Sequence, residues 1–401
     1  MPSPLVRVPS HPITLLSSGH ACVDIYQGSV AALVPFLVAE RAYSYAAAST
    51  IVLAGSLLSS IVQPLFGVLI DRRPMRWLLP GSTLLAGAGI ASVGVSASYL
   101  VTLVVVALSG IGVAAYHPAA AQAARTASGG SHTLMGWFAL GGNIGFVAAP
   151  LLVAGVIAVG GLPASPLLVI PALVGTALCL VALRGVPKPV STSLPHREAR
   201  GPDDWASFRK LTGAVICRSI VFVGLSSFIA LHAAQRMGGS AFTGTIALFV
   251  LYLGGAFGTI LGGFLASRWQ RVSIVRWAYV LSIFSVAGTV FAPGPLIYVF
   301  IALTSAGLYV PFALNVTLGQ DYLPGRLGTA SGVTLGLTVS IGGIASPFIG
   351  ALADVTSLEV ALTPLIALPG IGWLFLRTLR EPKSPHFGTR PVDVALDAAN
   401  R

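Results

Sequence analysis

Residues 67–76 read Gly67-Val-Leu-Ile-Asp71-Arg72-Arg-Pro-Met-Arg76, where a long apolar run gives way to a basic loop. A similar stretch, Gly263-Phe-Leu-Ala-Ser267-Arg268, closes another apolar run in the second half of the chain. Other pairs recur at nearly the same spacing, such as Ala107-Leu108 with Ala302-Leu303, and Pro150 with Pro347. The repeat predicts two similar halves.

Apolar runs fill both halves. Of the 401 residues, 55% are hydrophobic and 9% are charged, whereas soluble domains carry about 25% charged residues. Lipid accepts so much apolar surface, and a helix that crosses it needs about 20 mostly apolar residues. Such runs lie at roughly 14–39, 46–70, 77–96, 98–121, 133–160, 165–185, 211–234, 242–266, 273–292, 295–321, 328–352 and 360–379. They predict an all-α integral membrane protein of twelve transmembrane helices.

The runs divide into an N-terminal six-helix half, 1–185, and a C-terminal six-helix half, 211–380. Between them lies a charged, proline-containing stretch, 186–210, and a polar tail, 381–401, closes the chain. This is the layout of transporters built from parallel repeats. We expect the stretch at 186–210 to be a flexible cytoplasmic linker.

The net charge of +11 reflects membrane orientation better than nucleic-acid binding, because the charges sit in short loops between apolar runs. Cytoplasmic loops carry an excess of Lys and Arg. With both termini inside, 20 of the 23 basic residues are cytoplasmic, whereas Arg41 and Arg236 lie outside and Arg218 lies within a span. The sequence predicts a multi-pass plasma (inner) membrane protein that does not bind nucleic acid.

The chain resembles the major facilitator superfamily in its Gly67–Arg76 loop, although Pro74 stands where a glycine is common. More narrowly, it is similar to the fosmidomycin-resistance type of drug exporter, densely over 17–152 and thinly in the second half. That match rests on His20-x-x-x-Asp24-x-x-Gln27, Pro35-Phe36-Leu37, Ser59-Ser60-x-x-Gln63-Pro64-x-x-Gly67, Pro74-Met75-x-Trp77, Tyr116-His117-Pro118, Ala127-Ser128-Gly129-Gly130-x-His132, Gly141-Gly142-Asn143-x-Gly145-Phe146 and Pro150-Leu151-Leu152. The resemblance implies a twelve-helix transporter with a central cavity, and it leaves the substrate open.

Asp24 lies about ten residues into the first predicted span, and no other acid lies as deep in a span. A carboxylate there costs on the order of 3 kcal/mol, and intramembrane acids usually mark transport pathways. We predict a proton-coupling site at Asp24 with His20, one turn earlier on the same face. The alternative is a buried acid that only stabilises helix packing.

Arg218 lies in the seventh predicted span, at a position nearly symmetric to Asp24. The resemblance places both spans at the central cavity. A guanidinium there suits an anionic substrate and could act as the electrostatic counterweight of Asp24, although its long stem could instead snorkel to the interface. Further expected substrate-binding residues are Gln27, Tyr116, His117, Asn143, Tyr309 and Asn315.

The resemblance also implies a conformational gate at the ends of the second and eighth spans. Its expected residues are Gly67, Asp71, Arg72, Arg76, Ser267 and Arg268. Asp71 would stand at a helix C-terminus, where the dipole disfavours an anion, so a partner near Gly328 is expected. Two glycine stripes, Gly254-x-x-x-Gly258-x-x-x-Gly262 and Gly328-x-x-x-Gly332-x-x-x-Gly336, are typical of close helix packing.

Nucleotide-binding, zinc-protease and nucleophile-elbow motifs do not occur in the sequence. We therefore expect a monomeric secondary transporter that is not an enzyme, needs no cofactor or metal, and handles a small-molecule substrate and protons. The leading function is proton-coupled efflux (antiport) of small anionic or amphiphilic compounds such as antibiotics. The alternatives are a metabolite or organic-anion importer of the same fold, and a non-transporting membrane receptor or scaffold.

Overall fold

The computed structural model describes residues 10–72, 75–96, 98–129, 131–186, 202–239 and 241–382. The regular secondary structure of these residues is entirely helical. Its elements are α1 Ser10–Arg41, α2 Tyr45–Arg72, α3 Leu78–Ala91, α4 Tyr99–Ala127, α5 His132–Gly160, η1 Leu162–Val169, α6 Ile170–Gly185, α7 Trp205–Arg236, α8 Ala241–Ala266, α9 Arg271–Phe291, α10 Leu296–Tyr322, α11 Leu327–Ser331, η2 Gly332–Leu337, α12 Thr338–Val355, α13 Leu358–Leu362, η3 Thr363–Ile366 and α14 Ala367–Leu376.

Eleven helices in the described part of the chain are long and apolar enough to cross a membrane. The third predicted span, 77–96, contains the shorter helix α3, which ends at Ala91. A turn follows, and at Gly94 the backbone lies against the carbonyl group of Leu162, so a side chain there would clash. Fourteen residues rise only about 21 Å. The structure therefore supports an all-helical protein with eleven clear candidate spans, one fewer than predicted.

Helix α7 starts six residues before the predicted seventh span, at Trp205, where the Asp204 carboxylate accepts a hydrogen bond from the Ser207 N–H at 3.0 Å. That bond is a helix N-cap, and it holds the pKa of Asp204 below its usual value. Residues 202–210 of the predicted linker are thus described and mostly helical, whereas 187–201 lie outside the described residues.

Six helix ends meet at one end of the molecule, which we call the basic end. There the start of α1 approaches the end of α6 at Pro12 and Gly185, and Asp203, just before α7, accepts a bond from the Gly325 N–H after α10. The start of α9 is tied to the end of α14 through Arg271 and Glu381. Arg41 and Arg236 lie at the other end, which we call the opposite end.

The two halves fix their ends with equivalent arginines. At the opposite end, Arg41 donates to the carbonyls of Gly94 and Ser96, and Arg236 donates to those of Phe291 and Ala292. Each arginine lies at the end of the first helix of its half. Arg41 binds carbonyls just after the end of the third helix, α3, and Arg236 binds carbonyls at the end of the corresponding helix, α9. Cationic side chains suit these carbonyl-rich helix ends. The shared contacts agree with the internal repeat of the sequence.

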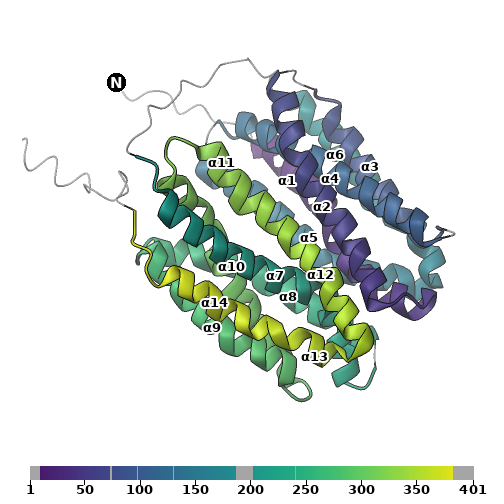
Figure 1. The fold of residues 1–401 in the computed structure, drawn as a ribbon. Helices are drawn as coiled ribbons and strands as arrows, with labels where there is room; N and C mark the ends of the chain where they lie inside the picture. The colour runs from purple at the N-terminus through teal and green to yellow at the C-terminus, as the bar shows by residue number, and fades with distance from the viewer. Residues whose placement is uncertain are drawn as a thin grey trace, which may run out of the picture.

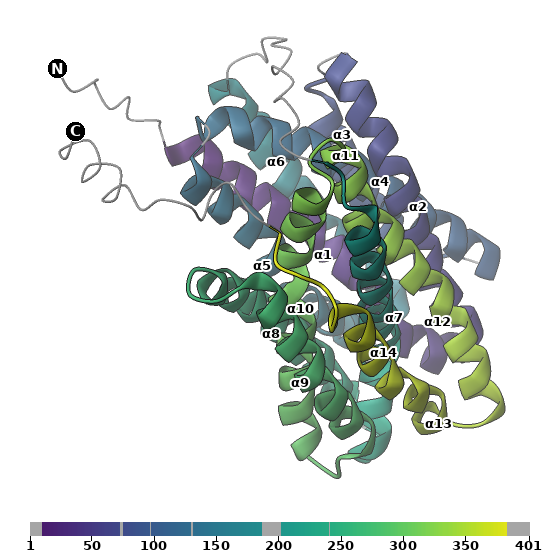
Figure 2. The ribbon, with the colours of Figure 1, turned by 60° about the vertical axis from the view of Figure 1, so that its left-hand side comes forward.

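The two bundles lie side by side, with α12 alongside α2 (Figure 1), and Figure 2 shows the same arrangement from another side. They are latched at the opposite end, where the Asp354 carboxylate of α12 accepts from the N–H groups of Tyr45 and Ala46 at 2.7 and 3.0 Å. Gly343 and Gly350 pack closely on Ser56 and Ser49. Toward the basic end the same helices separate.

The separation of α2 from α11 and η2 is seen from the free space around four glycines. A methyl group added at Gly67, Gly328 or Gly332 would meet no atom within 4 Å, and one at Gly336 would only graze the Ser60 carbonyl at 3.8 Å. The predicted packing of the Gly328 stripe is therefore wrong for this conformation, because its partner helix is too far away. The Gly254 stripe does pack as predicted, against Ser305, Tyr309 and Val310 of α10.

Candidate functional site

Asp24 lies on α1 and is buried between two imidazoles. Its Oδ2 atom is 3.3 Å from His20 Nε2, one turn away on the same helix, and its Oδ1 atom is 3.1 Å from His117 Nε2 on α4. Only 5% of Asp24 and 8% of His20 are exposed to solvent. The structure thus brings together three residues that are separated in the sequence, and it places His117, predicted to bind substrate, beside the pair predicted to couple protons.

The second nitrogen of each imidazole faces a backbone carbonyl. His20 Nδ1 is 2.9 Å from the Phe138 oxygen on α5, and His117 Nδ1 is 2.8 Å from the Val113 oxygen of its own helix. A carbonyl oxygen can only accept a hydrogen bond, so both Nδ1 atoms carry the proton. In a neutral histidine the Nε2 atom is then an acceptor. Both Nε2 atoms point at the Asp24 carboxyl group, which, when ionised, can also only accept hydrogen bonds.

The cluster is therefore satisfied only when it holds extra protons. With Asp24 ionised and both histidines neutral, acceptor faces acceptor at 3.1 and 3.3 Å. One added proton turns one of these contacts into a charge-assisted hydrogen bond, and a second proton does the same for the other. Because the side chains come from α1 and α4, proton binding bears directly on how these two helices pack.

Aromatic rings and a glycine confine the cluster. The His20 ring stacks on Phe138 with centroids 4.4 Å apart, and on Tyr116 with centroids 6.0 Å apart. At Gly142 of α5, an added methyl group would come within 2.9 Å of His20 Nε2 and would collide with Asp24. Only glycine lets α5 lie this close. The sequence shows Gly142 in a Gly-Gly-Asn motif, but its role became visible only in the packing.

Two imidazoles and a carboxylate are also a donor set that a transition metal ion accepts. The three donor atoms lie within 4.8 Å of one another. Each histidine is oriented through its second nitrogen by a carbonyl, as metal-binding histidines commonly are. The same geometry thus fits a shared proton or a metal ion, and the response to a chelator separates the two.

A cavity lies one helical turn from this cluster, toward the opposite end. It is formed by both halves, and its volume of about 90 Å³ holds a few water molecules rather than a drug-sized compound. Its lining includes Gln27, three residues after Asp24, and Val113, four residues before His117. The lining also includes small aliphatic residues and a set of hydroxyl-bearing or aromatic ones, namely Tyr26, Ser56, Ser59, Ser109, Phe146, Phe222, Ser226 and Tyr252.

Arg218 is buried on α7, one turn from the cavity residue Phe222, with 5% of its surface exposed. Its Nη1 donates to the Leu308 carbonyl at 3.1 Å, and its guanidinium lies 5.2 Å from the centre of the Phe312 ring. Its Nε atom has no hydrogen-bond partner among the described residues. The expected pairing with Asp24 is not formed here: each residue is held by its own half.

The remaining predicted substrate residues are spread over α5 and α10. Tyr309 packs against Phe222 with centroids 5.3 Å apart, so it connects the surroundings of Arg218 with the cavity wall. Asn315 is buried, and neither atom of its amide group finds a hydrogen-bond partner within the described residues. Asn143 is half-buried beside Gly142. The carbonyls of Phe138 and Val113 carried no signal in the sequence.

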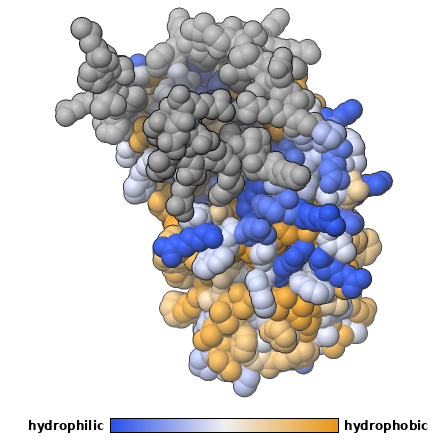
Figure 3. All heavy atoms as spheres, turned by 90° about the vertical axis from the view of Figure 1, so that its left-hand side faces the viewer, coloured by the Kyte–Doolittle hydropathy of each residue, from blue (hydrophilic) through white to orange (hydrophobic). Residues whose placement is uncertain are grey.

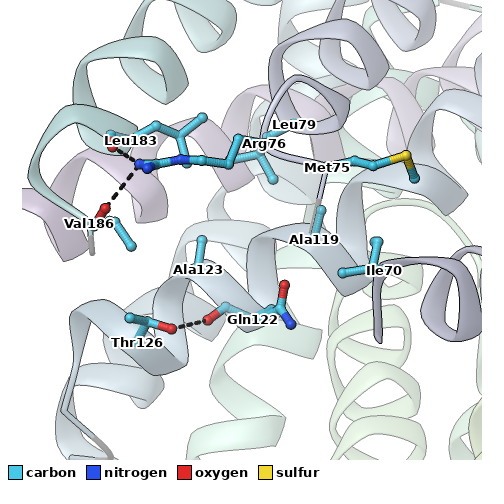
Figure 4. Close-up of a pocket in the computed structure, with 10 residues that line it drawn as sticks. All are labelled: Ile70, Met75, Arg76, Leu79, Ala119, Gln122, Ala123, Thr126, Leu183 and Val186. Atoms are coloured by element: carbon cyan, nitrogen blue, oxygen red, sulfur yellow. Dashed lines mark hydrogen bonds between the residues drawn. The ribbon is translucent and has the colours of Figure 1, made fainter. Parts of the chain in front are cut away.

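The predicted gate residues whose side chains are described make separate local contacts. Arg76 donates to the carbonyls of Leu183 and Val186 at the end of α6 (Figure 4), and Ser267 donates to the Phe264 carbonyl of its own helix at 2.7 Å. The Arg268 guanidinium lies 4.3 Å over the Phe264 ring. Gly67 faces open space. Asp71 and Arg72 end helix α2, and their side chains lie outside the described part of the structure.

Two helical bundles with a cavity between them are the arrangement of a membrane transporter of the secondary kind, not an enzyme. The family model of the Major Facilitator Superfamily matches residues 16–390, and the chain belongs to this superfamily. It is 28% identical over 393 residues to the fosmidomycin resistance protein of Escherichia coli (strain K12), covering 92% of each chain. The predicted resemblance is confirmed.

Solved structures of other transporters share the fold. A bacterial homolog of the human lysosomal transporter Spinster, in an inward-facing and occupied conformation, superposes with a TM-score of 0.76 at 16% identity, covering 94% of this chain and 99% of the other. The nucleoside transporter NupG gives a TM-score of 0.75 at 12% identity, covering 92% and 100%. At these identities the likeness concerns the fold alone.

Proposed function

We propose that this protein is a proton-coupled exporter of small anionic or amphiphilic compounds of the fosmidomycin type. The observation that carries the proposal is the His20–Asp24–His117 cluster, whose contacts require a proton and which lies one turn from the cavity shared by the halves. Relatedness to a fosmidomycin resistance protein supports the substrate class.

The basic end is then the cytoplasmic side, as the distribution of arginines favours. The halves are latched at the opposite end by Asp354 and separated at Gly67 and Gly328. This conformation is therefore inward-facing in the proposed orientation, and the substrate enters the cavity from the cytoplasm. The protein belongs to the plasma (inner) membrane and acts as a monomer in this scheme.

The cavity lining supports the proposed preference for amphiphilic compounds. Aromatic rings such as Phe146 and Tyr252 bind apolar parts, whereas Gln27 and the serines offer hydrogen bonds. An acidic group of the substrate binds Arg218, whose Nε is unpartnered and which no described acid neutralises. The acidic group of the substrate and the proton therefore bind to different halves of the protein.

Exchange follows from this separation. Protons that arrive from outside form hydrogen bonds between Asp24 and the two histidines, and the bond to His117 draws α1 and α4 together. When these protons are released to the cytoplasm, the Asp24 carboxylate and the histidine Nε2 atoms are all acceptors, so they repel each other and separate. Gln27 of α1 and Val113 of α4 line the cavity. Each binding or release of a proton therefore changes the positions of these two residues in the cavity wall. The cavity conformation that binds substrate and the one that releases it then alternate with proton occupancy.

The test is transport by purified protein in liposomes with an imposed pH gradient, using fosmidomycin among a panel of antibiotics. Asp24→Asn keeps hydrogen-bonding capacity but cannot ionise, so gradient-driven accumulation should be lost while substrate binding persists. A chelator should leave the wild-type rate unchanged. Wild-type coupling in Asp24→Asn would refute the proton role, and loss of transport with the chelator would favour the metal.

An importer of metabolites or organic anions remains the second candidate, because Arg218 suits either direction of transport. The direction is tested in a sensitive host: export lowers the drug content of the cells and raises resistance, whereas import raises the drug content. Membership of a transporter superfamily argues against the receptor or scaffold that the sequence also left open.

A further inference from the structure

An apolar groove on the outer surface of the C-terminal half opens toward a polar pocket at the basic end. The groove, of about 420 Å³, lies between α8, α9 and α10. The pocket, of about 330 Å³, is formed by residues 266–271 with Glu381 and Pro382. Trp269 lines both, so the two spaces are adjacent and one ligand can reach from one to the other around this ring.

The groove has the dimensions of one lipid leaflet. Its α9 wall runs from Ser273 to Leu281, a rise of about 12 Å, compared with about 15 Å for half of the hydrocarbon core. Ala278, Ala306 and Gly307 form a floor of small residues. Because its walls are apolar and exposed, the groove faces lipid and suits an acyl chain.

The polar pocket offers one uncommitted cation. Arg268 is exposed, and among the described residues it enters no ion pair, with only the Phe264 ring beneath it. Arg271 is instead engaged by Asp321 at 2.7 Å and by Glu381 at 2.8 Å. The Glu381 carboxylate also accepts from the Val272 N–H at 2.9 Å. Arg271 is thus fully engaged by these two carboxylates, whereas Arg268 has no acidic partner among the described residues and can bind an anion.

The polar pocket suits the level where membrane meets water, and the groove extends from it along the leaflet. Trp269 and Trp277 are 58% and 73% exposed, and exposed tryptophans are enriched at the level of lipid headgroups. On the side shown in Figure 3, hydrophilic residues form a band next to an apolar surface. A ligand that fills both spaces therefore has a polar head at this level and an apolar tail beside α9.

We infer that the groove and pocket form a binding site for an anionic phospholipid of the leaflet at the basic end. Its phosphate binds Arg268, and one acyl chain occupies the groove between Trp269 and Leu281. A lipid with a net negative headgroup is preferred over a zwitterionic one, because the amine of the latter offsets the attraction of the phosphate for Arg268. The inference does not depend on the transported substrate.

The two groove tryptophans provide the readout. The protein is placed in phosphatidylcholine bilayers that contain a small share of lipid brominated on its acyl chains, either phosphatidylglycerol or phosphatidylcholine. Bromine quenches a tryptophan that it touches, and subtraction of a Trp269→Phe, Trp277→Phe protein isolates the signal of this pair. We expect phosphatidylglycerol to quench the pair at a concentration at least threefold lower than phosphatidylcholine does.

Arg268→Gln should abolish this preference, whereas Arg184→Gln, which removes an exposed arginine near the same end from the N-terminal half, should retain it. Both are surface changes that leave the helices intact. Equal quenching by the two lipids in the wild-type protein would overturn the inference. So would a preference that survives Arg268→Gln, because the phosphate would then be bound elsewhere.

Discussion

At the scale of single residues, the cluster around Asp24 shows how hydrogen-bond direction can define a proton site. Neither histidine can turn its protonated Nδ1 toward Asp24 without breaking its bond to a carbonyl of Phe138 or Val113. An unpaired buried acceptor costs about 1–3 kcal/mol. The tautomer is therefore set by the backbone, and the carboxylate can bind the imidazoles only through an added proton.

His117→Gln is the sharpest residue-level test of this arrangement. The glutamine amide can donate to Asp24 at every pH, so the contact no longer depends on a proton. We expect gradient-driven transport to fall by about tenfold, in line with the loss of one charge-assisted bond, and its pH dependence to flatten. Transport rates measured between pH 5.5 and 8 check this.

His232→Gln is the matched control, since His232 is also buried but contacts the Val290 carbonyl near the opposite end. It should keep the wild-type pH profile. If His117→Gln kept that profile as well, α4 would have no part in proton binding, and the pair His20–Asp24 would act alone.

At the scale of elements, α2 and α12 form a latch between the halves. The Asp354 carboxylate at the end of α12 caps the first N–H groups of α2, and a cap of this kind contributes about 1 kcal/mol. Asp354→Asn removes the charge that favours a helix N-terminus. We expect the ratio of inward-facing to outward-facing protein to fall by about fivefold.

Distances between spin labels on the opposite-end termini of α2 and α12 measure this ratio. Glu359→Gln serves as the control, because its ion pair with Arg236 lies within the C-terminal half and should not affect the latch. A distance distribution that Asp354→Asn leaves unaltered would mean that helix packing at Gly343 and Gly350, rather than the carboxylate, keeps this end closed.

At the scale of the whole molecule, closing the basic end must bring the α2 residues near Gly67 toward α11. Gly67→Cys introduces a thiol into open space, so a membrane-impermeant maleimide should label it in inside-out vesicles. Asp71 is proposed to close this end in the outward-facing state. Asp71→Asn should therefore raise labelling of Cys at position 67 about twofold or more and cripple transport, whereas Ser267→Ala should be mild.

Gly263→Cys supplies the repeat-related control, because that glycine also has no neighbour within 4 Å but lies on α8, away from the closing surface of α2. Its labelling should not respond to Asp71→Asn. Equal transport defects in Asp71→Asn and Ser267→Ala would contradict the proposed asymmetry between the two halves.

Hydropathy, the repeat at Gly67 and Gly263, and the placement of arginines were enough to predict a helical membrane transporter of two halves, because a segment in lipid must satisfy its backbone within its own helix. The length of the third predicted span, 77–96, was overestimated. Its helix ends at Ala91, and the close contact of Gly94 with Leu162 that follows depends on tertiary packing. Asp24 and His20 were identifiable as polar residues on one helix face, and both are buried.

Tertiary structure alone decided which residues Asp24 meets. Position in a span tells how deep a side chain lies, but partners depend on helix rotation and on the neighbour that packs there. Gly142 allows α5 to pack against Asp24, and α4 places His117 next to the same carboxylate. Arg218 donates to the Leu308 carbonyl of its own half and does not contact Asp24. The sequence by itself thus determined the fold and the buried charges, whereas helix packing decided how these charges are paired.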